Sequence, residues 1–474
     1  MDYPYMDEIL SQLLGDTFSV FCGAGATADV TGKQWQSIFS EQTRLYYEDK
    51  LSDDIYFLAD LEKSYYGNQD CFPEAVADRL RISNNVQSRH IDAITDLTIN
   101  QIWTTNFDAV IEQTIQRKYG FEPTVIKESK DIFLNGLSGR YLVYKLNGSV
   151  DVPSTMILTK KDFYDYSKKQ RLLFELLKRQ LVLDTFLFIG YSFKDDLVLN
   201  ALREIKDVFP QKGKCHYRFF IEKTDRIKDG EPEEQFLQRQ ERRKAYENYE
   251  RLYYEDFYHI KTICIQSYDE IDKYLSELYK RYCNRNVFIS GSFRHISPEQ
   301  RIYIEKVVDQ LVQTLFAEKY NIYSGNGRGL GEIVVARSDK YQQKYGGKFV
   351  NRPLIFTGDS AQEKREKNEL IMKDCNTMII ICGQSEHDEV SRNVVSQCEQ
   401  FLQRGSSNTM PLVIPIPSTG NAAEYLYESE LFTSTAIFRN NKEVFQKLST
   451  NNDPKEIARI VVNLILSYRA EPNS

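Results

Sequence analysis

Histidine, tryptophan and paired cysteines are scarce in this sequence. Only five histidines and two tryptophans occur among 474 residues, and the eight cysteines form no C-x-x-C pair. No two histidines have the spacing of metal ligands, so we expect free, mostly buried thiols and no metal site. The same cysteine pattern gives no reason to expect a disulfide framework.

Positive charge is not in excess. The 61 lysines and arginines are outnumbered by 68 aspartates and glutamates, which gives a net charge of −7. No overall basic field therefore attracts nucleic acid or an anionic lipid surface. No apolar run reaches the roughly 20 residues of a membrane helix, and the acidic N-terminal segment has no secretory pattern. We expect a cytoplasmic protein that binds neither nucleic acid nor membrane.

The apolar runs that do occur have the length of β-strands and alternate with helical patterns. Such alternation predicts parallel sheets layered by helices. A polar segment at 281–286 separates the two halves, so we predict two Rossmann-like α/β domains, residues 1–283 and 284–474. The expected strands are 18–22, 102–105, 141–146, 185–190 and 260–266 in the first domain, and 286–290, 321–324, 348–356, 377–382 and 411–416 in the second.

Residues 231–258 have the longest helical pattern. Apolar side chains recur there at three- and four-residue spacing, which predicts an amphipathic helix. Two interpretations stay open: its apolar face forms an oligomer interface, or it packs on the core of its own domain. The side chains concerned are Phe236, Leu237, Tyr246, Tyr249, Leu252 and Tyr253.

Four expected strands of the first half end in small and polar residues. The first runs into Gly23-Ala24-Gly25-Ala26-Thr27, and the others into T-T-N-F-D at 104–108, N-G-S-V-D at 147–151 and G-Y-S-F-K-D at 190–195. Glycine directly after a strand lets the backbone approach a pyrophosphate, although the third glycine of the dinucleotide fingerprint is absent. Because ligands bind at the carboxyl ends of parallel strands, we expect these segments to line one pocket.

In this order, the four motifs resemble the sirtuin-like domain of the NAD-consuming effectors of Thoeris antiphage defence systems. That family also carries a C-terminal SLOG (Smf/LOG-like) domain, so the resemblance covers the whole chain. It implies hydrolysis of NAD, the substrate, to nicotinamide and ADP-ribose. It assigns Asn106 to the orientation of water and ribose, and Asp108 to the support of that loop. The resemblance further implies that Gly23 and Gly25 cradle the pyrophosphate, that Ala24, Ala26 and Thr27 lie nearby, and that Gly190 and Ser192 face the adenosine half.

Asn147 departs from the family, which has a histidine at this catalytic position. An amide cannot accept a proton at neutral pH, and it lacks the titratable nitrogen of histidine. The chain is therefore either an NAD hydrolase that works by positioning, or a catalytically weak or dead nucleotide-binding regulator. Whether Asn147 is native or engineered stays open. A protein deacylase is disfavoured, because the zinc-binding insert of the deacylase sirtuins has four cysteines and this chain has no such pattern.

Two glycine-rich turns follow the first two expected strands of the second half. Gly291-Ser292 follows the first, and Gly325, Gly327 and Gly329 follow the second, as in a phosphate cradle. This pair resembles the SLOG family. The P-G-G-x-G-T-x-x-E signature of its cytokinin-nucleotide-cleaving enzymes is replaced by C-G-Q-S-E-H at 382–387, which favours a sensor over an enzyme.

For this second domain, the resemblance to the Thoeris branch implies a specific ligand and assembly. The ligand is a cyclic ADP-ribose isomer made by a TIR-domain partner protein. It would contact Gly291, Ser292, Gly325 and Gly327, with Lys367 (or Arg365) as the cation and Glu399 as the carboxylate. The family also forms homo-oligomers, as tetramers or filaments.

Overall fold

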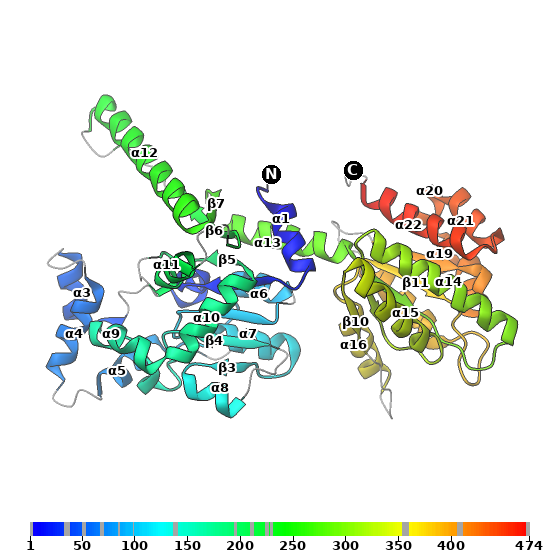
Figure 1. The fold of residues 1–474 in the computed structure, drawn as a ribbon, viewed down its shortest axis with the longest axis horizontal. Helices are drawn as coiled ribbons and strands as arrows, with labels where there is room; N and C mark the ends of the chain where they lie inside the picture. Colours follow the sequence, from blue (N-terminus) through cyan, green and yellow to red (C-terminus); the bar gives the residue numbers. More distant parts are fainter. Residues whose placement is uncertain are drawn as a thin grey trace. The chain divides into compact units, whose positions relative to one another are not determined.

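Two parallel sheets, each covered by helices, organise the computed structural model of this chain (Figure 1). The structure describes residues 3–32, 38–49, 54–66, 71–83, 86–97, 99–135, 141–193, 197–208, 213–222, 227, 231–352, 360–404 and 411–470. Contacts divide the chain into two compact units, Met1–Leu278 and Tyr279–Ser474. The division falls within helix α13 (Asp269–Asn284), whereas the sequence pattern places the boundary between residues 283 and 284.

The sheet of the first unit has seven strands in the order β3-β4-β2-β1-β5-β6-β7, and all its pairs are parallel. Strand β1 lies between β2 and β5, so the chain order reverses beside it. Such a switch point is where open α/β sheets bind ligands. The strands are β1 (Phe18–Cys22), β2 (Gln101–Thr104), β3 (Thr124–Ile126), β4 (Leu142–Lys145), β5 (Thr185–Ile189), β6 (His216–Ile221) and β7 (Ile260–Ile265).

The sheet of the second unit has five parallel strands in the order β10-β9-β8-β11-β12. Strand β8 lies between β9 and β11, which creates a second switch point directly after the first strand of this unit. The strands are β8 (Asn286–Ser290), β9 (Asn321–Ser324), β10 (Phe349–Asn351), β11 (Thr377–Ile381) and β12 (Leu412–Ile416).

Helices connect the strands and cover the faces of both sheets (Figure 1). In the described parts of the chain, none of them is long and apolar enough to cross a bilayer. The helices of the first unit are α1 (Met6–Leu14), α2 (Ala28–Thr31), α3 (Glu41–Glu48), α4 (Ile55–Tyr65), α5 (Cys71–Leu80), α6 (Arg89–Asp96), α7 (Val110–Tyr119), α8 (Ser129–Asn135), α9 (Lys160–Lys169), α10 (Arg171–Leu183), α11 (Leu197–Val208) and α12 (Glu233–Tyr258). After α13 come α14 (Pro298–Ala317), α15 (Leu330–Tyr345), α16 (Ala361–Met372), α17 (Arg392–Gln403), α18 (Asn421–Glu428), α19 (Glu430–Thr433), α20 (Ala436–Asn440), α21 (Lys442–Thr450) and α22 (Pro454–Ala470).

The structure confirms the predicted fold class, two α/β domains with parallel sheets. The ten expected strands all appear, with ends that differ by a few residues; of the expected strand 348–356, residues 353–359 lie outside the described residues. Strands β3 and β6 were not predicted. The first has only three residues, and the second carries the charged Arg218 in its centre.

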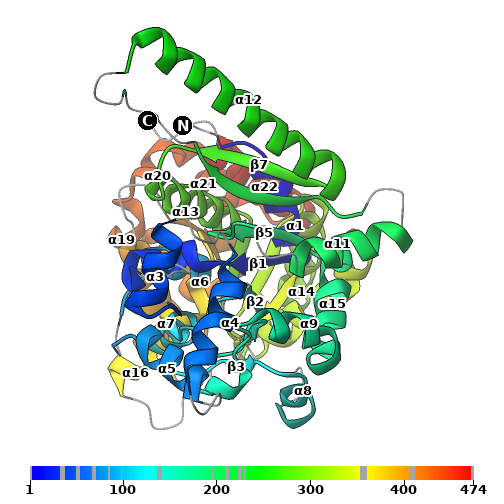
Figure 2. The same cartoon turned by 90° about the vertical axis from the view of Figure 1, so that its left-hand side faces the viewer.

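Helix α12 exists, but the interpretation in which its recurring apolar residues pack on the core of their own domain was wrong, while the oligomer interface stays a prediction. Within it only Tyr254 and Tyr258 are buried, at the end that packs on β7. Tyr246 and Tyr249 are 68% and 72% exposed, so the recurring aromatic residues face away from the core. Figure 2 shows the helix lying above β7 and extending beyond it. The short-range spacing predicted a helix correctly, but it could not tell which side faces the sheet.

His216 is a buried, uncharged histidine at the start of β6. Its side chain is 2% exposed, and its Nδ1 accepts a hydrogen bond of 3.1 Å from the backbone amide of Phe186. Burial, followed by the nearby positive charges of His259 and Lys214, lowers the pKa of His216 from 6.5 to about 3. The folded chain therefore keeps this ring neutral at a pH where an exposed histidine is protonated.

This histidine should make the first unit less stable as the pH falls. Between pH 6.5 and about 3 the unfolded chain binds a proton that folded His216 does not, so stability drops as pH decreases and is unaffected above that window. The variant His216→Asn keeps an acceptor for the amide of Phe186. Between pH 7 and pH 5, the free energy of unfolding of the parent chain should fall by about 2 kcal/mol more than that of this variant. Urea unfolding at both pH values measures this difference. The same pH dependence in His216→Asn as in the parent chain would contradict the assignment.

Candidate functional site

The turn after β1 is pressed against the turn after β5. The amide of Gly23 donates to the carbonyl of Ile189 (2.9 Å), and the amide of Gly25 donates to that of Gly190 (3.0 Å). A Cβ at Gly23 would lie 2.5 Å from the carbonyl oxygen of Gly190, and one at Gly190, whose φ is +64°, would overlap the amide of Ala26. Gly23, Gly25 and Gly190 therefore require glycine, because a side chain at any of them would prevent the close approach of the two backbones. Their place at the switch point favours the predicted pyrophosphate cradle, although the amides of Gly23 and Gly25 are already engaged.

Asn106 joins the turn after β2 to the turn after β1. Its side chain is 6% exposed, and its Nδ2 donates to the carbonyl of Gly23 (3.1 Å) and to Oγ1 of Thr27 (3.2 Å). Thr27 in turn donates to Asp108 (3.0 Å), whose other carboxylate oxygen accepts from the amide of Val110 (3.1 Å). Among the described residues no partner is recorded for Oδ1 of Asn106, so this oxygen is available to accept a hydrogen bond from a ligand or water.

Asn147 lies at the end of β4 and is fully buried. Neither its Nδ2 nor its Oδ1 has a hydrogen-bond partner in the described structure. The backbone around it is fixed, because its carbonyl accepts from Ile157 (2.9 Å) and Gly148, with φ +83°, passes against the carbonyl of Thr155. An unsatisfied buried amide costs about 1–3 kcal/mol of stability. The described structure therefore bears this cost at Asn147.

The remaining predicted residues of this domain surround the same turns. Ala24 is half-buried, while Ala26 and Thr27 are buried beside the cradle. Ser192 is exposed two residues after Gly190. Of the fourth motif, Lys194 and Asp195 lie outside the described residues. Burial, together with the Asp108 carboxylate, raises the pKa of Cys22, so the thiol next to the cradle stays protonated and is not a nucleophile.

Lys145, at the last position of β4, is a site-forming residue that the sequence analysis missed. Its fully buried ammonium group donates to the carbonyl oxygens of Phe107 (3.2 Å) and Asp108, and it pairs with Glu112 (3.0 Å). It therefore fixes the loop that carries Asn106. The signal in the sequence was a single charged residue within a strand that is otherwise apolar.

A small apolar cluster holds the same loops from the outside. Phe107 and Val150 belong to it together with residues of α4 and α5. The amide of Val150 also donates to the carbonyl of Phe107 (3.0 Å), so a backbone hydrogen bond joins the turns after β2 and β4.

In the second unit, the turns after β8, β9 and β11 are bonded to one another. The carbonyl of Ser292 accepts from Gly383 (3.0 Å) and Gln384 (2.7 Å), and the amide of Phe293 donates to Arg328 (2.9 Å). A Cβ at Gly327 would overlap the carbonyl of Gly291. The structure thus brings Gly291, Ser292 and Gly327 together, with Gly325 half-buried directly after β9.

Unlike the glycines, Lys367 and Glu399 lie on helices and not in the joined turns. Lys367 is half-buried on α16, Arg365 is exposed on the same helix, and Glu399 is exposed on α17. The buried polar side chains of these helices are their neighbours Asn368 and Gln397, joined at 3.0 Å.

Gln397 also accepts from Ser290 at the end of β8 (2.7 Å). Asn368 and Gln397 therefore connect α16 and α17 to the end of β8. In the sequence, the signal for these two residues was their place close to the predicted Lys367 and Glu399.

Two arginines at the rim of these turns were also missed. Arg294, after β8, and Arg328, after β9, both pair with Glu386, which follows β11. The pairing of Glu386 with the two guanidinium groups, Arg294 first, lowers the pKa of its carboxyl group. Three exposed charges thus surround the glycine-rich turns.

Comparison with known proteins identifies the class of both domains. Residues 100–250 match the SIR2-like domain, and residues 270–468 match the Sir2- and TIR-associating SLOG family. The chain therefore carries a SIR2-like domain followed by a SLOG domain, and the turns at its two switch points are the candidate sites of those domains.

Several proteins named NAD(+) hydrolase ThsA resemble the chain over most of its length. It is 25% identical over 476 residues to the NAD(+) hydrolase ThsA of Enterococcus faecium, covering 96% of both chains. It is 24% identical over 482 residues to ThsA of Bacillus cereus, covering 97% of this chain and 96% of that one. ThsA of Cytobacillus dafuensis is 28% identical over 364 residues, which is 74% of this chain and 70% of the relative.

Removal of the Lys145 ammonium group should destabilise the Asn106 loop. In Lys145→Met the carboxylate of Glu112 and two buried carbonyls lose their donor, so we expect a loss of about 3–5 kcal/mol in the stability of the first unit. Chemical unfolding measures this loss, and Lys145→Met/Glu112→Leu should recover part of it. As a matched control, Lys178→Met breaks ion pairs on exposed helices and should change stability by about 1 kcal/mol or less. Equal effects of the two lysine variants would contradict the role given to Lys145.

Proposed function

We propose that the SIR2-like domain hydrolyses NAD to nicotinamide and ADP-ribose, and that the SLOG domain controls this reaction in antiphage defence. The observation that carries the proposal is the convergence of Asn106 and the glycine turns at the switch point of the first sheet. The relatives named NAD(+) hydrolase ThsA support the reaction. The SLOG domain of the Sir2- and TIR-associating family supports the control.

In the proposed reaction, Asn106 orients the groups around the anomeric carbon. The bond between nicotinamide and ribose breaks with its electron pair leaving on nicotinamide, and water adds to the resulting oxocarbenium-like carbon. Oδ1 of Asn106 can accept a hydrogen bond from that water or from a ribose hydroxyl, because its Nδ2 is held by Gly23 and Thr27. The proton released from water passes to solvent, since Asn147 cannot take it.

Asn147 supplies hydrogen bonds rather than base catalysis in this proposal. Its unsatisfied amide, both donor and acceptor, suits the hydroxyls and the carboxamide of the substrate. A ligand that pairs with this amide also removes its desolvation cost, so NAD binding should be favoured even where turnover is slow.

The same residue favours a second candidate function, a nucleotide-binding regulator with weak or no catalysis. Without a general base the rate falls by roughly a hundred- to ten-thousand-fold. The binding turns and Asn106 remain complete in that case, so binding and turnover must be measured separately.

The signal proposed for the SLOG domain is a cyclic ADP-ribose isomer made by a TIR-domain partner protein. The joined turns that contain Gly291, Ser292, Gly325 and Gly327 suit a pyrophosphate, and Arg294 and Arg328 add positive charge at their rim. We also propose a homo-oligomer, because the outward aromatic residues of α12 offer an apolar surface for contact between copies.

Asn106→Ala should abolish nicotinamide release, because the side-chain oxygen assigned to the orientation of the attacking water is lost. Thr27→Ala is the matched control, since it breaks the same hydrogen-bond chain but keeps Oδ1 of Asn106. We expect the control to retain at least about a hundredth of the parent rate, corresponding to the loss of the two hydrogen bonds of the Thr27 hydroxyl. Rates come from nicotinamide release, and unfolding curves check both folds. If both variants lose activity equally, Asn106 only holds the loops together.

Asn147→His should raise NAD hydrolysis by at least about tenfold, because histidine supplies the general base that the amide lacks. Its rate should also rise with pH through the histidine pKa, whereas the parent rate should not. Asn147→Gln is the control for a change of size without a base. A rate that stays flat in the histidine variant would show that positioning alone serves this site.

Addition of a cyclic ADP-ribose isomer to the full-length Asn147→His chain tests the control by the SLOG domain. Nicotinamide release should increase with the isomer and should not increase in a chain that also carries Gly327→Val, because the added Cβ would overlap the carbonyl of Gly291 and force the joined turns apart. Activity without any response to the isomer would leave the hydrolase intact and refute the signal. Binding of NAD without turnover in every variant would favour the regulator.

A further inference from the structure

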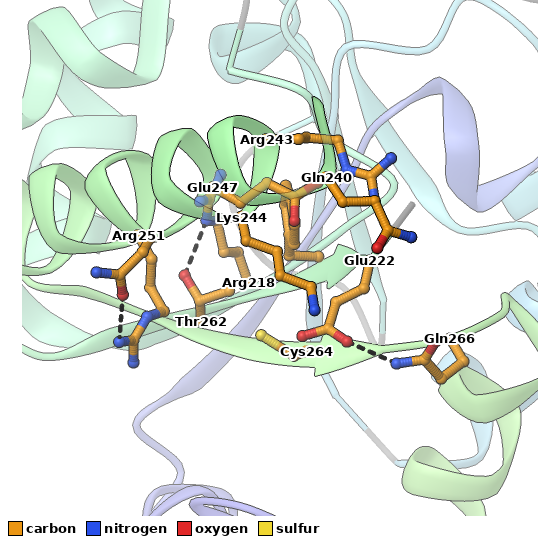
Figure 3. A pocket seen from close by; sticks show the side chains of 12 residues that line it. Arg218, Glu222, Gln240, Arg243, Lys244, Glu247, Arg251, Thr262, Cys264 and Gln266 are labelled. Atoms are coloured by element: carbon orange, nitrogen blue, oxygen red, sulfur yellow. Dashed lines mark hydrogen bonds and ion pairs between the residues drawn. The ribbon is translucent and has the colours of Figure 1, made fainter. Parts of the chain in front are cut away.

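Helix α12 presents a polar side, not an apolar one, to the two outermost strands of its sheet. Residues at three- and four-residue spacing on the helix, among them Lys244, Glu247 and Arg251, face Arg218, Thr262 and Gln266 of the strand region (Figure 3). Between them lies a cavity of about 620 Å³, within the usual size range of small-molecule sites. A helix that covers a sheet normally buries apolar side chains there, so this cavity needs another explanation.

The floor of the cavity is rigid and its charges are balanced. The guanidinium group of Arg218, on β6, pairs with Glu250 (3.0 Å), donates to Thr262 (3.1 Å) and lies 4.0 Å from the centre of the Tyr254 ring. Its side chain is only 6% exposed. The floor is therefore already assembled, and an occupant does not have to organise it.

The helix side of the cavity keeps positive charge that the protein does not neutralise. Arg243 pairs with Glu247 (3.3 Å), whereas Arg251 donates only to the neutral Asn248 (2.9 Å) and Lys244 has no recorded ion pair within the described ranges. Figure 3 shows Lys244 extending from α12 toward the strands. Opposite them, Glu222 accepts from the neutral Gln266 (2.6 Å).

We propose that this cavity binds a small molecule that carries both a phosphate group and hydroxyl groups, of the size of a pentose phosphate. Lys244 and Arg251 bind the phosphate as charge-assisted donors, while Glu222 and Gln266 pair with the hydroxyls. A purely apolar ligand would leave these charges unpaired, and a lone phosphate ion would fill only part of the volume. The cavity lies beside β6 and β7, whereas the proposed NAD site follows β1, β2 and β5, so this inference does not depend on the proposed function.

Calorimetric titration of the full-length chain with ribose 5-phosphate tests the proposal. We expect saturable binding with a dissociation constant below about 1 mM, weaker at high salt, and no binding of ribose. Lys244→Glu reverses a charge in the cavity and should weaken binding at least about tenfold. Arg242→Glu makes the same charge change on an exposed neighbouring position outside the cavity and should alter the affinity less than twofold.

A second variant from the strand side checks the location independently of the helix. Gln266→Glu adds negative charge next to Glu222 and should also weaken ribose 5-phosphate binding. The proposal is overturned if the ligand does not bind, or if it binds Lys244→Glu and Arg242→Glu equally well. It is also overturned if ribose binds as tightly as ribose 5-phosphate, because the phosphate would then contribute nothing.

Discussion

The contact between the turns after β1 and β5 is the constraint on which the first domain depends. Gly23, Gly25 and Gly190 let the two backbones touch, and this contact fixes the edge of the sheet at which the polar residues gather. The side chain of Asn106 is positioned by this contact, because its amide donates a hydrogen bond to the carbonyl of Gly23. Lys145 and the apolar cluster around Phe107 then hold the loop of Asn106 from the other side. The second domain repeats the arrangement with Gly291 and Gly327, again beside the strand at which the chain order reverses.

Much of this could be predicted from the sequence, because strand ends and glycine positions are local signals. The runs at Phe18–Cys22 and Asn286–Ser290 are short, apolar and followed by glycine, and both strands occur with those bounds. The residues that complete the sites were harder to find. Lys145 and Gln397 act through partners that are remote in the chain, and a single buried charge or amide in a helix or strand gives no periodic signal.

Helix α12 illustrates the opposite case, in which a strong local pattern left two interpretations open and the structure contradicts one of them, packing on the core. Aromatic residues at helical spacing usually face a core, but here Tyr246 and Tyr249 face outward, and charged residues of the helix line the cavity over β6 and β7. Spacing determines which residues share a side of a helix, whereas the packing of the rest of the chain determines which side is buried. The same long-range packing places His216 where its ring stays neutral.

The separation of the glycine turns from Asn147 has an evolutionary consequence. Codons for histidine and asparagine differ by one nucleotide, and residue 147 is buried at a position where neither amide atom is used by the described parts of the protein. A single point mutation can therefore exchange a base for an amide there without disturbing the backbone contact that shapes the site. If the proposed roles hold, a lineage with these two domains could lose or regain a general base in one step and keep the turns proposed to bind the ligand.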